Sequence, residues 1–206
     1  MPRFNLNIER IVIDGDISIL SDAVSEIDLL LQTMSTETEE MKSTLLRYSG
    51  SNQGTQYLKC ASASLNLSRS LYDVAENLNI LQRQVVEYCR RVVRFEELNI
   101  ILPSPRPFDV QPIIVEVNRG IIRFDVPEMI IVRDSLRQYS ENIREGFRTL
   151  NSHVQDIGSV WKDPQYKDFV NWIDEVTSHI LPKCNQLEEY SDYLNNIIIH
   201  LTTGGV

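Results

Sequence analysis

Residues 160–169 read Val160-Trp161-Lys162-Asp163-Pro164-Gln165-Tyr166-Lys167-Asp168-Phe169. This stretch lies between two long runs in which apolar residues recur every three or four positions, which is the spacing of one helix face. Asp163 suits a helix N-cap and Pro164 suits the first helical position. One helix is therefore expected to end near Trp161 and another to begin at Pro164. Because the connection is short, the two helices should be antiparallel and form a helical hairpin.

The first half of the chain carries the same pattern. Apolar spacing predicts one helix from Ile17 to Tyr48 and a second from about Gln53 to Glu97. Gly50 stands near the C-cap of the first of these helices, where glycine is favoured. Two amphipathic hairpins bury their apolar faces best against each other. The expected fold is therefore all-α, with two tandem helical hairpins forming a four-helix bundle.

A proline-rich linker separates the two predicted hairpins. Prolines at positions 103, 105, 107 and 112 exclude a helix there. Residues 113–117 and 121–124 flank Asn118-Arg119-Gly120 and read as a small β-hairpin, with the extended stretch 3–13 as a neighbour for it. The predicted domains are residues 1–97, the linker 98–124, and residues 125–206.

Short matches between the halves support a tandem repeat. Residues 3–6 (Arg-Phe-Asn-Leu) recur as residues 123–126 (Arg-Phe-Asp-Val), and Ile11 and Asp14 recur as Ile131 and Asp134. Both matches have an offset of 120 residues (123 − 3 and 131 − 11). Repeats of this kind usually mark equivalent structural units.

These features resemble the Trp-X-Gly (WXG, ESAT-like) family of small helical hairpins exported by type VII secretion systems. Val126-Pro127-Glu128 resembles the helix-opening signature of that family, and Trp161-Lys162-Asp163 stands at its Trp-X-Gly position, with Asp163 in place of the glycine. In the first half, Tyr48-Ser49-Gly50 keeps the glycine and replaces the tryptophan. Members of the family pair as dimers of hairpins, so the resemblance implies that this chain is an internal pseudo-dimer.

The resemblance also implies which residues contact partners. The predicted partner-binding residues are Trp161, Asp163, Phe169, Trp172, Tyr48 and Gly50. We expect Trp161 to lie at the hairpin tip and to cover Phe169, either partly exposed or fully buried as a residue that closes the end of the bundle. The export signal of the family resembles Tyr-x-x-x-Asp/Glu, and Tyr72 with Glu76 fits these letters, although the pair falls inside a predicted helix.

Composition and motifs exclude several classes of function. The formal net charge of −9 argues against a general nucleic-acid-binding surface. The beginning of the sequence has no apolar signal core, and no apolar run is long enough to span a membrane. None of His153, His179 and His200 has the Glu-x-x-His spacing of di-iron bundles, and the sequence has no P-loop or zinc motif. We therefore expect no enzyme activity, no cofactor and no metal.

The favoured function is non-enzymatic interaction with another helical protein or with secretion machinery. The chain would be a secreted factor, or a partner or chaperone of a secreted helical effector, cytoplasmic before an export that needs no Sec signal. The alternative is a structural adaptor subunit of a phage-like or injection assembly, with the β-hairpin as its contact. Membrane insertion after opening of the bundle and a homodimer through the linker hairpin are further hypotheses.

Overall fold

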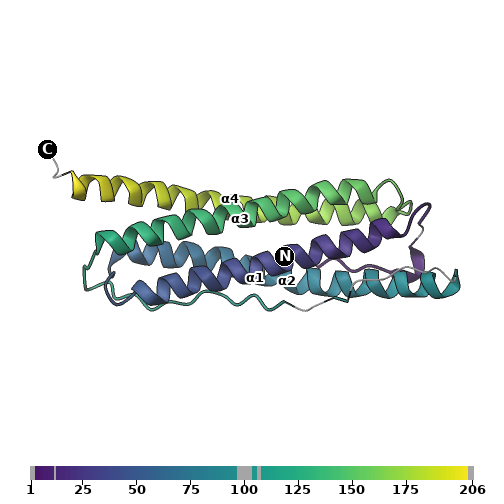
Figure 1. Cartoon of the computed structure of the whole chain (residues 1–206), viewed down its shortest axis with the longest axis horizontal. Coiled ribbons are helices and arrows are strands. Elements are labelled where there is room, and N and C mark those ends of the chain that lie inside the picture. The colour runs from purple at the N-terminus through teal and green to yellow at the C-terminus, as the bar shows by residue number, and fades with distance from the viewer. Residues whose placement is uncertain (1–2, 12, 97–103, 106–107, 204–206) are drawn as a thin grey trace. The chain divides into compact units, whose positions relative to one another are not determined.

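The computed structural model describes residues 3–11, 13–96, 104–105 and 108–203. Within these residues the chain is helical, as the sequence predicts, and contains no β-strand. The four long helices, labelled in Figure 1, each begin within two residues of the predicted position. They are α1 (Ser18–Tyr48), α2 (Thr55–Phe95), α3 (Val126–Ile157) and α4 (Pro164–Thr202), and a single 3-10 turn, η1 (Ile8–Arg10), precedes them.

The chain forms two compact units, and each helix contributes a segment to both. Unit 1 comprises Met1–Thr33, Asp73–Asp109 and Glu145–Ser178, and unit 2 comprises Met34–Tyr72, Val110–Arg144 and His179–Val206. Each unit therefore has its own core of four helical segments. Unit 1 contains the turn between α3 and α4, and unit 2 contains the turn between α1 and α2. The predicted division of the chain at residues 98–124 stays a prediction.

The core of unit 1 follows the predicted stripes. Its buried side chains include Leu20, Val24, Ile27, Leu31, Val74, Leu78, Leu81, Leu150, Val154, Ile157, Ile173 and Val176. The helix α3 ends at Ile157, four residues earlier than predicted. After Ile157 the chain continues with hydrogen bonds between residues three positions apart, as in a 3-10 helix. Gly158 N–H donates to Gln155 O (3.2 Å) and Val160 N–H donates to Ile157 O (3.0 Å). This tightened turn directs Trp161 into the unit, where it is 4% exposed.

The core of unit 2 is equally dense and includes one polar pair. Its buried side chains include Met34, Met41, Leu45, Leu67, Leu71, Met129, Val132, Leu136, Ile143, Ile180, Cys184 and Leu187. Thr38 interrupts the predicted stripe of α1, and its hydroxyl bonds the hydroxyl of Tyr139 (3.0 Å) with both residues buried. The break in the pattern is therefore a satisfied polar position within the core.

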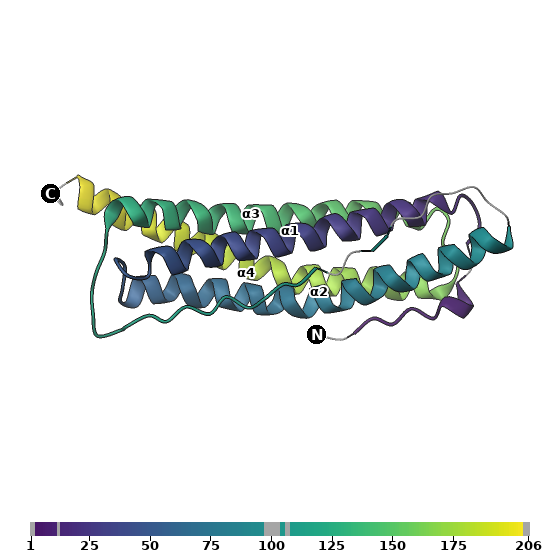
Figure 2. The ribbon, with the colours of Figure 1, turned by 60° about the horizontal axis from the view of Figure 1, so that its bottom comes forward.

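The predicted β-hairpin in residues 113–124 is wrong. This segment is extended, but its backbone bonds other parts of unit 2: Ile113 N–H donates to Ser68 Oγ (2.8 Å), and Asn118 N–H donates to Gln53 Oε1 (2.6 Å). Val110 and Ile113 are buried. Figure 2 shows that this segment runs alongside α2. These backbone N–H groups are hydrogen-bonded to a side chain of α2 and to one in the α1–α2 turn. The two halves of the segment therefore do not pair with each other.

The repeat is present as helices, but with another offset. The helix α3 begins 108 residues after α1 (126 − 18), and α4 begins 109 residues after α2 (164 − 55). The offset of 120 predicted from short matches is therefore wrong: residues 131–134 lie inside α3, whereas residues 13 and 14 precede α1. In the observed register Trp161 corresponds to Asn52, since each stands three residues before the second helix of its hairpin.

Candidate functional site

The turn before α4 is built around Trp161 and Asp163. One carboxylate oxygen of Asp163 accepts the indole N–H of Trp161 (2.5 Å), and the other accepts the backbone N–H of Gln165 (2.8 Å). Asp163 therefore caps α4, as the sequence predicts, and also fixes the indole. Asp163 thus has a clear structural role in this turn.

Five aromatic rings pack around this turn in unit 1. The ring centroids of Trp161 and Phe169 are 5.8 Å apart, and those of Phe169 and Trp172 are 6.4 Å apart. Tyr166 lies 6.0 Å from Trp161, and Phe4 lies 5.6 Å from Phe169 and 5.9 Å from Trp172. We call these residues the aromatic cluster. Its spacings are those of favourable aromatic pairs.

Three members of the aromatic cluster are buried rather than exposed, whereas Phe4 and Tyr166 are half-buried. Trp161 is 4% exposed, Phe169 is 2% exposed and Trp172 is 5% exposed. Of the two alternatives for Trp161, full burial is the one observed. The rings are covered by Phe4, which comes from a segment that precedes α1, and by the backbone around Ile13, which forms an antiparallel bridge with Trp161. These three predicted residues meet one another, but no surface is open to a partner while Phe4 covers them.

The segment that covers the cluster was predicted as the extended neighbour of a linker β-hairpin, but it packs against the turn before α4 instead. We call residues 3–11 together with 13 and 14 the arm. Asp14 N–H donates to Val160 O (2.8 Å), and Gly15, with φ of 137°, directs the chain from the arm into α1. A Cβ atom at Gly15 would lie 2.8 Å from Val160 Cγ1. The alternation of Phe4 and Leu6 with polar residues was the available signal for a segment with one buried face.

The turn between α1 and α2 in unit 2 has the same plan with polar chemistry. Asn52 is fully buried: its Oδ1 accepts Asp125 N–H (2.8 Å), and its Nδ2 donates to Glu128 Oε2 (2.8 Å) and Tyr48 O (3.3 Å). Gln53 forms an antiparallel bridge with Arg123. The segment before α3 thus closes the turn of the first hairpin, as the arm closes the turn of the second.

The predicted residues of this turn contribute less than Asn52. Tyr48 is half-buried and Gly50 is exposed. A Cβ atom at Gly50 would meet nothing within 4 Å, so the chain does not need glycine there. The glycine that the turn needs is Gly54, with φ of 100° and with Ile121 O only 3.0 Å from a built Cβ.

The candidate export motif lies inside α2. Tyr72 is half-buried, and the carboxylate of Glu76 lies 3.6 Å from the guanidinium of Arg3 in the arm. Both residues have the regular helical conformation that the sequence predicts for them. Their role in export stays a prediction.

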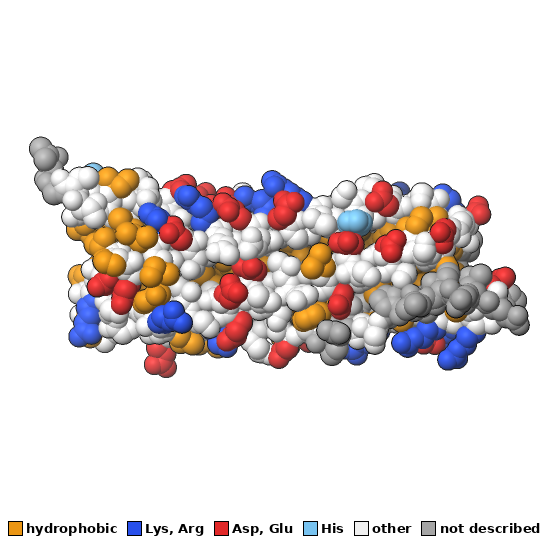
Figure 3. Space-filling view, in the orientation of Figure 1, with side chains coloured by type: hydrophobic (Ala, Val, Ile, Leu, Met, Phe, Trp, Pro, Cys, Tyr) orange, Lys and Arg blue, Asp and Glu red, His pale blue; other side chains and the backbone are white. Residues whose placement is uncertain are grey.

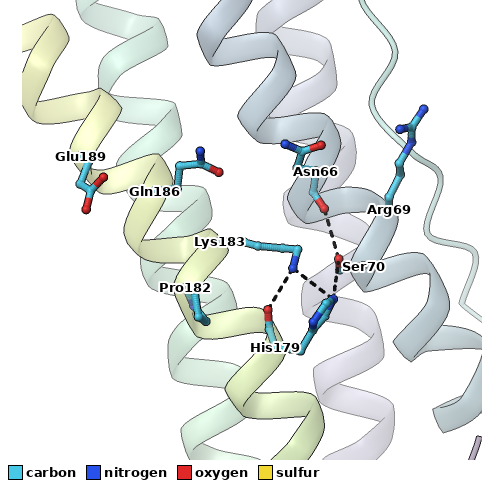
Figure 4. Close-up of a pocket in the computed structure, with 8 residues that line it drawn as sticks. All are labelled: Asn66, Arg69, Ser70, His179, Pro182, Lys183, Gln186 and Glu189. Carbon is cyan, nitrogen blue, oxygen red and sulfur yellow. Dashed lines mark hydrogen bonds between the residues drawn. The ribbon is translucent and has the colours of Figure 1, made fainter. Parts of the chain in front are cut away.

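A polar pocket of about 670 Å³ lies between α2 and α4 in unit 2 (Figure 4). His179 Nε2 lies 3.3 Å from Ser70 Oγ and 3.1 Å from Lys183 Nζ, and burial lowers the pKa of Lys183. The Ser70 hydroxyl also lies 3.3 Å from Asn66 O, the same distance that separates it from His179 Nε2. These contacts join α2 to α4 through hydrogen bonds within unit 2.

Unit 2 also carries most of the exposed apolar surface. Eight of the ten large hydrophobic side chains that are exposed among the described residues belong to it. Three of them lie near the beginning of α3 and the end of α4, and one lies in the segment before α3. We call these four residues the apolar end: Ile122 (90% exposed), Ile131 (45%), Ile199 (47%) and Leu201 (57%). Figure 3 shows apolar side chains gathered there, at the left of the view.

Comparison with known proteins adds no family. No family model, curated protein or solved structure matches this chain. Among the described residues, no helix combines the length and apolar character that a membrane crossing requires. The same residues contain no group of three or more His, Cys, Asp or Glu side chains placed to hold a metal ion.

Proposed function

We propose that this chain is a non-enzymatic interaction protein of the kind found in type VII secretion, resembling a fused pair of Trp-X-Gly hairpins. It would be a secreted factor, or the partner of a secreted helical effector. The observation that carries the proposal is the apolar end of unit 2, where four large aliphatic side chains are exposed on the ends of α3 and α4 and on the segment before α3. Exposed apolar patches on folded proteins mark contact sites.

The arrangement of α3 and α4 explains how the apolar end could receive a helix. Arg133 in α3 donates to Asn195 Oδ1 in α4 (2.8 Å), and Ser191 in α4 donates to Arg133 O (3.1 Å). These bonds hold the two helix ends together, with Ile131 and Ile199 on exposed positions beside them. An amphipathic helix binds such a surface through apolar residues at helical spacing.

The tandem architecture supports the resemblance to paired hairpins. The first helices of the two hairpins have 31 and 32 residues, and the second helices have 41 and 39. Each turn is closed by the segment that precedes the other hairpin. Two separate hairpins that exchanged such segments would form the dimer that the resemblance implies. The adaptor alternative relied on the linker β-hairpin, which is absent from the described residues.

Binding to helical proteins encoded beside this gene tests the proposal. We expect the double variant Ile199→Ser, Leu201→Ser to bind a co-expressed helical partner about tenfold more weakly or worse, with an unchanged unfolding midpoint. Leu29→Ser is the matched control, because Leu29 is 53% exposed in unit 1. Equal binding by both variants would remove the apolar end as the contact surface, and neighbouring tail or baseplate genes would favour the adaptor alternative.

A further inference from the structure

Residues 3–7 of the arm, before the 3-10 turn η1, form an extended segment in unit 1 with one buried face. Leu6 is 5% exposed and Phe4 is half-buried, whereas Arg3, Asn5 and Asn7 between and beside them are exposed. The ring of Phe4 packs on Phe169 and Trp172, at centroid distances of 5.6 and 5.9 Å. Phe4 and Leu6, two residues apart, thus pack against the helices. Domains that bind extended peptides likewise contact every second side chain of the peptide. We call the receiving surface the arm groove, and its residues are Glu76, Gln84, Gln165, Phe169 and Trp172.

Two glutamine side chains of the arm groove bind the backbone of the arm. Gln165 uses both ends of its amide: Oε1 accepts Asn7 N–H (2.7 Å), and Nε2 donates to Asn7 O (3.2 Å). Gln84 Oε1 accepts Leu6 N–H (3.3 Å). Such bonds do not depend on the side chain of the bound residue, so they fix the direction and depth of an extended peptide while its apolar residues supply specificity.

One ion pair extends the recognition. The guanidinium of Arg3 lies 3.6 Å from the carboxylate of Glu76, with both groups largely exposed. The pattern that the arm groove receives is therefore basic, aromatic, any residue, aliphatic, read from residues 3 to 6.

We propose that the arm groove is a binding site for an extended peptide of this pattern, and that its occupant in trans is the arm of a second copy of this chain. The contacts described here join residues 3–7 to α2 and α4, whereas the chain continues from the arm into α1. An arm from another copy replaces every one of these contacts with an identical contact. Exchange of an identical element between copies is a low-cost route to a dimer.

The structure also provides a hinge for this exchange. Gly15 lies directly between the arm and Asp16, which caps α1 through a bond from Ser18 N–H (2.9 Å). Glycine adopts positive and negative φ with similar ease, so the arm can change direction there without disturbing the first turn of α1. When the arm leaves, it uncovers Phe169 and Trp172, two of the aromatic residues predicted to contact a partner. This inference concerns unit 1 and does not depend on the apolar end of unit 2.

A labelled peptide with the sequence of residues 3–10, Arg-Phe-Asn-Leu-Asn-Ile-Glu-Arg, tests the site on the full chain. The double variant Phe4→Ala, Leu6→Ala vacates the groove, and circular dichroism verifies that it keeps its helices. By fluorescence anisotropy, we expect the peptide to bind the vacated chain about tenfold more tightly than the native chain, whose own arm competes. Gln165→Ala in the vacated chain, or alanine in place of the peptide's phenylalanine, should weaken binding by a similar factor. A folded, vacated chain that binds this peptide no better than a scrambled one overturns the proposal.

Light scattering tests the second copy. We expect the fraction of dimer to rise with the concentration of the native chain, to fall when the peptide is added in excess, and to be absent in the vacated variant. A native chain that stays monomeric at every accessible concentration overturns the assignment of a second copy, even where the peptide binds.

Discussion

Trp161 and Asn52 occupy the same place in two helical hairpins and solve the same problem with opposite chemistry. Each lies three residues before the second helix of its hairpin, and each is buried within its own unit. At Trp161 the turn is closed by ring packing. At Asn52 the turn is closed by three hydrogen bonds of one side-chain amide, which accepts from Asp125 N–H and donates to Glu128 Oε2 and Tyr48 O.

The incoming segment explains the difference. In unit 1 the arm brings the ring of Phe4, which packs beside the aromatic residues of α4. In unit 2 the segment before α3 brings the backbone N–H of Asp125 and the carboxylate of Glu128, and an asparagine amide complements both. The comparison shows that the position before the second helix must be filled, and that the segment arriving there determines the residue type.

The largest effect is expected from Trp161→Ala. This change removes a buried ring and its hydrogen bond to Asp163, and it should lower the free energy of unfolding by about 3–5 kcal/mol. Urea unfolding followed by circular dichroism measures it. Tyr48 is half-buried and is the residue that the alignment of the two halves of the sequence matched with Trp161, so it serves as the control. Tyr48→Ala should cost about 1 kcal/mol. Equal costs would contradict the equivalence of Trp161 with Asn52.

Asn52→Ala should have the next largest effect. It removes the buried amide that bonds the backbone N–H of Asp125 and the carboxylate of Glu128, which should cost about 1–3 kcal/mol of unfolding free energy. The same urea experiment applies. Gly50→Ala in the same turn is the control and should change stability by less than about 0.5 kcal/mol, because the new methyl group meets nothing. A neutral Asn52→Ala would show that the polar turn does not hold the hairpin.

Phe4→Ala should cost less than either, about 1–2 kcal/mol, since Phe4 is only half-buried. The loss should be confined to unit 1. Proton NMR of the indole N–H groups of Trp161 and Trp172 should therefore change, while the amide signal of Asn52 stays in place. A shift of the Asn52 signal comparable to those of the indoles would contradict this confinement.

The smallest effect concerns pH, with opposite signs in the two units. In unit 1 the backbone N–H of Ser18 holds the pKa of Asp16 below its usual 3.8. The stability that Asp16 contributes is therefore present above that value and is lost as pH falls through the lowered pKa. In unit 2 burial raises the pKa of Glu37 above its usual 4.5, so its contribution is present at low pH and is lost as pH rises through the raised pKa. The thermal unfolding midpoint, measured between pH 2 and pH 7, should depend on pH differently in the two variants. Relative to the native chain, Asp16→Asn and Glu37→Gln should change that dependence with opposite signs, and changes of the same sign would contradict this.

The helices were predicted well because helix formation depends mainly on residues that are close in sequence. Apolar spacing, the Asp163-Pro164 cap and the prolines of the linker determine where helices begin and end. The same spacing brings Phe169 and Trp172 together, since they are three residues apart on α4.

The long-range pairings could not be predicted. Phe4 packs on residues more than 160 positions away, and Arg123 pairs with Gln53 across 70 residues (123 − 53). A β-prone stretch such as residues 113–117 does not reveal whether its backbone will bond another strand or the side chains of a helix. Asn52 likewise appeared as an ordinary turn residue, because its partners Asp125 and Glu128 come from the other half of the chain.

The central claim is that each hairpin turn is closed by the segment preceding the other hairpin. Native-state hydrogen exchange at two amides tests it most directly: Asp14 N–H bonds Val160 O (2.8 Å), and Gln53 N–H bonds Arg123 O (2.9 Å). Both amides should exchange far more slowly than in an unstructured peptide. Phe4→Ala should weaken the protection of Asp14 alone, and Asn52→Ala the protection of Gln53 alone. Exchange of both amides at the unstructured rate in the native protein would contradict the account.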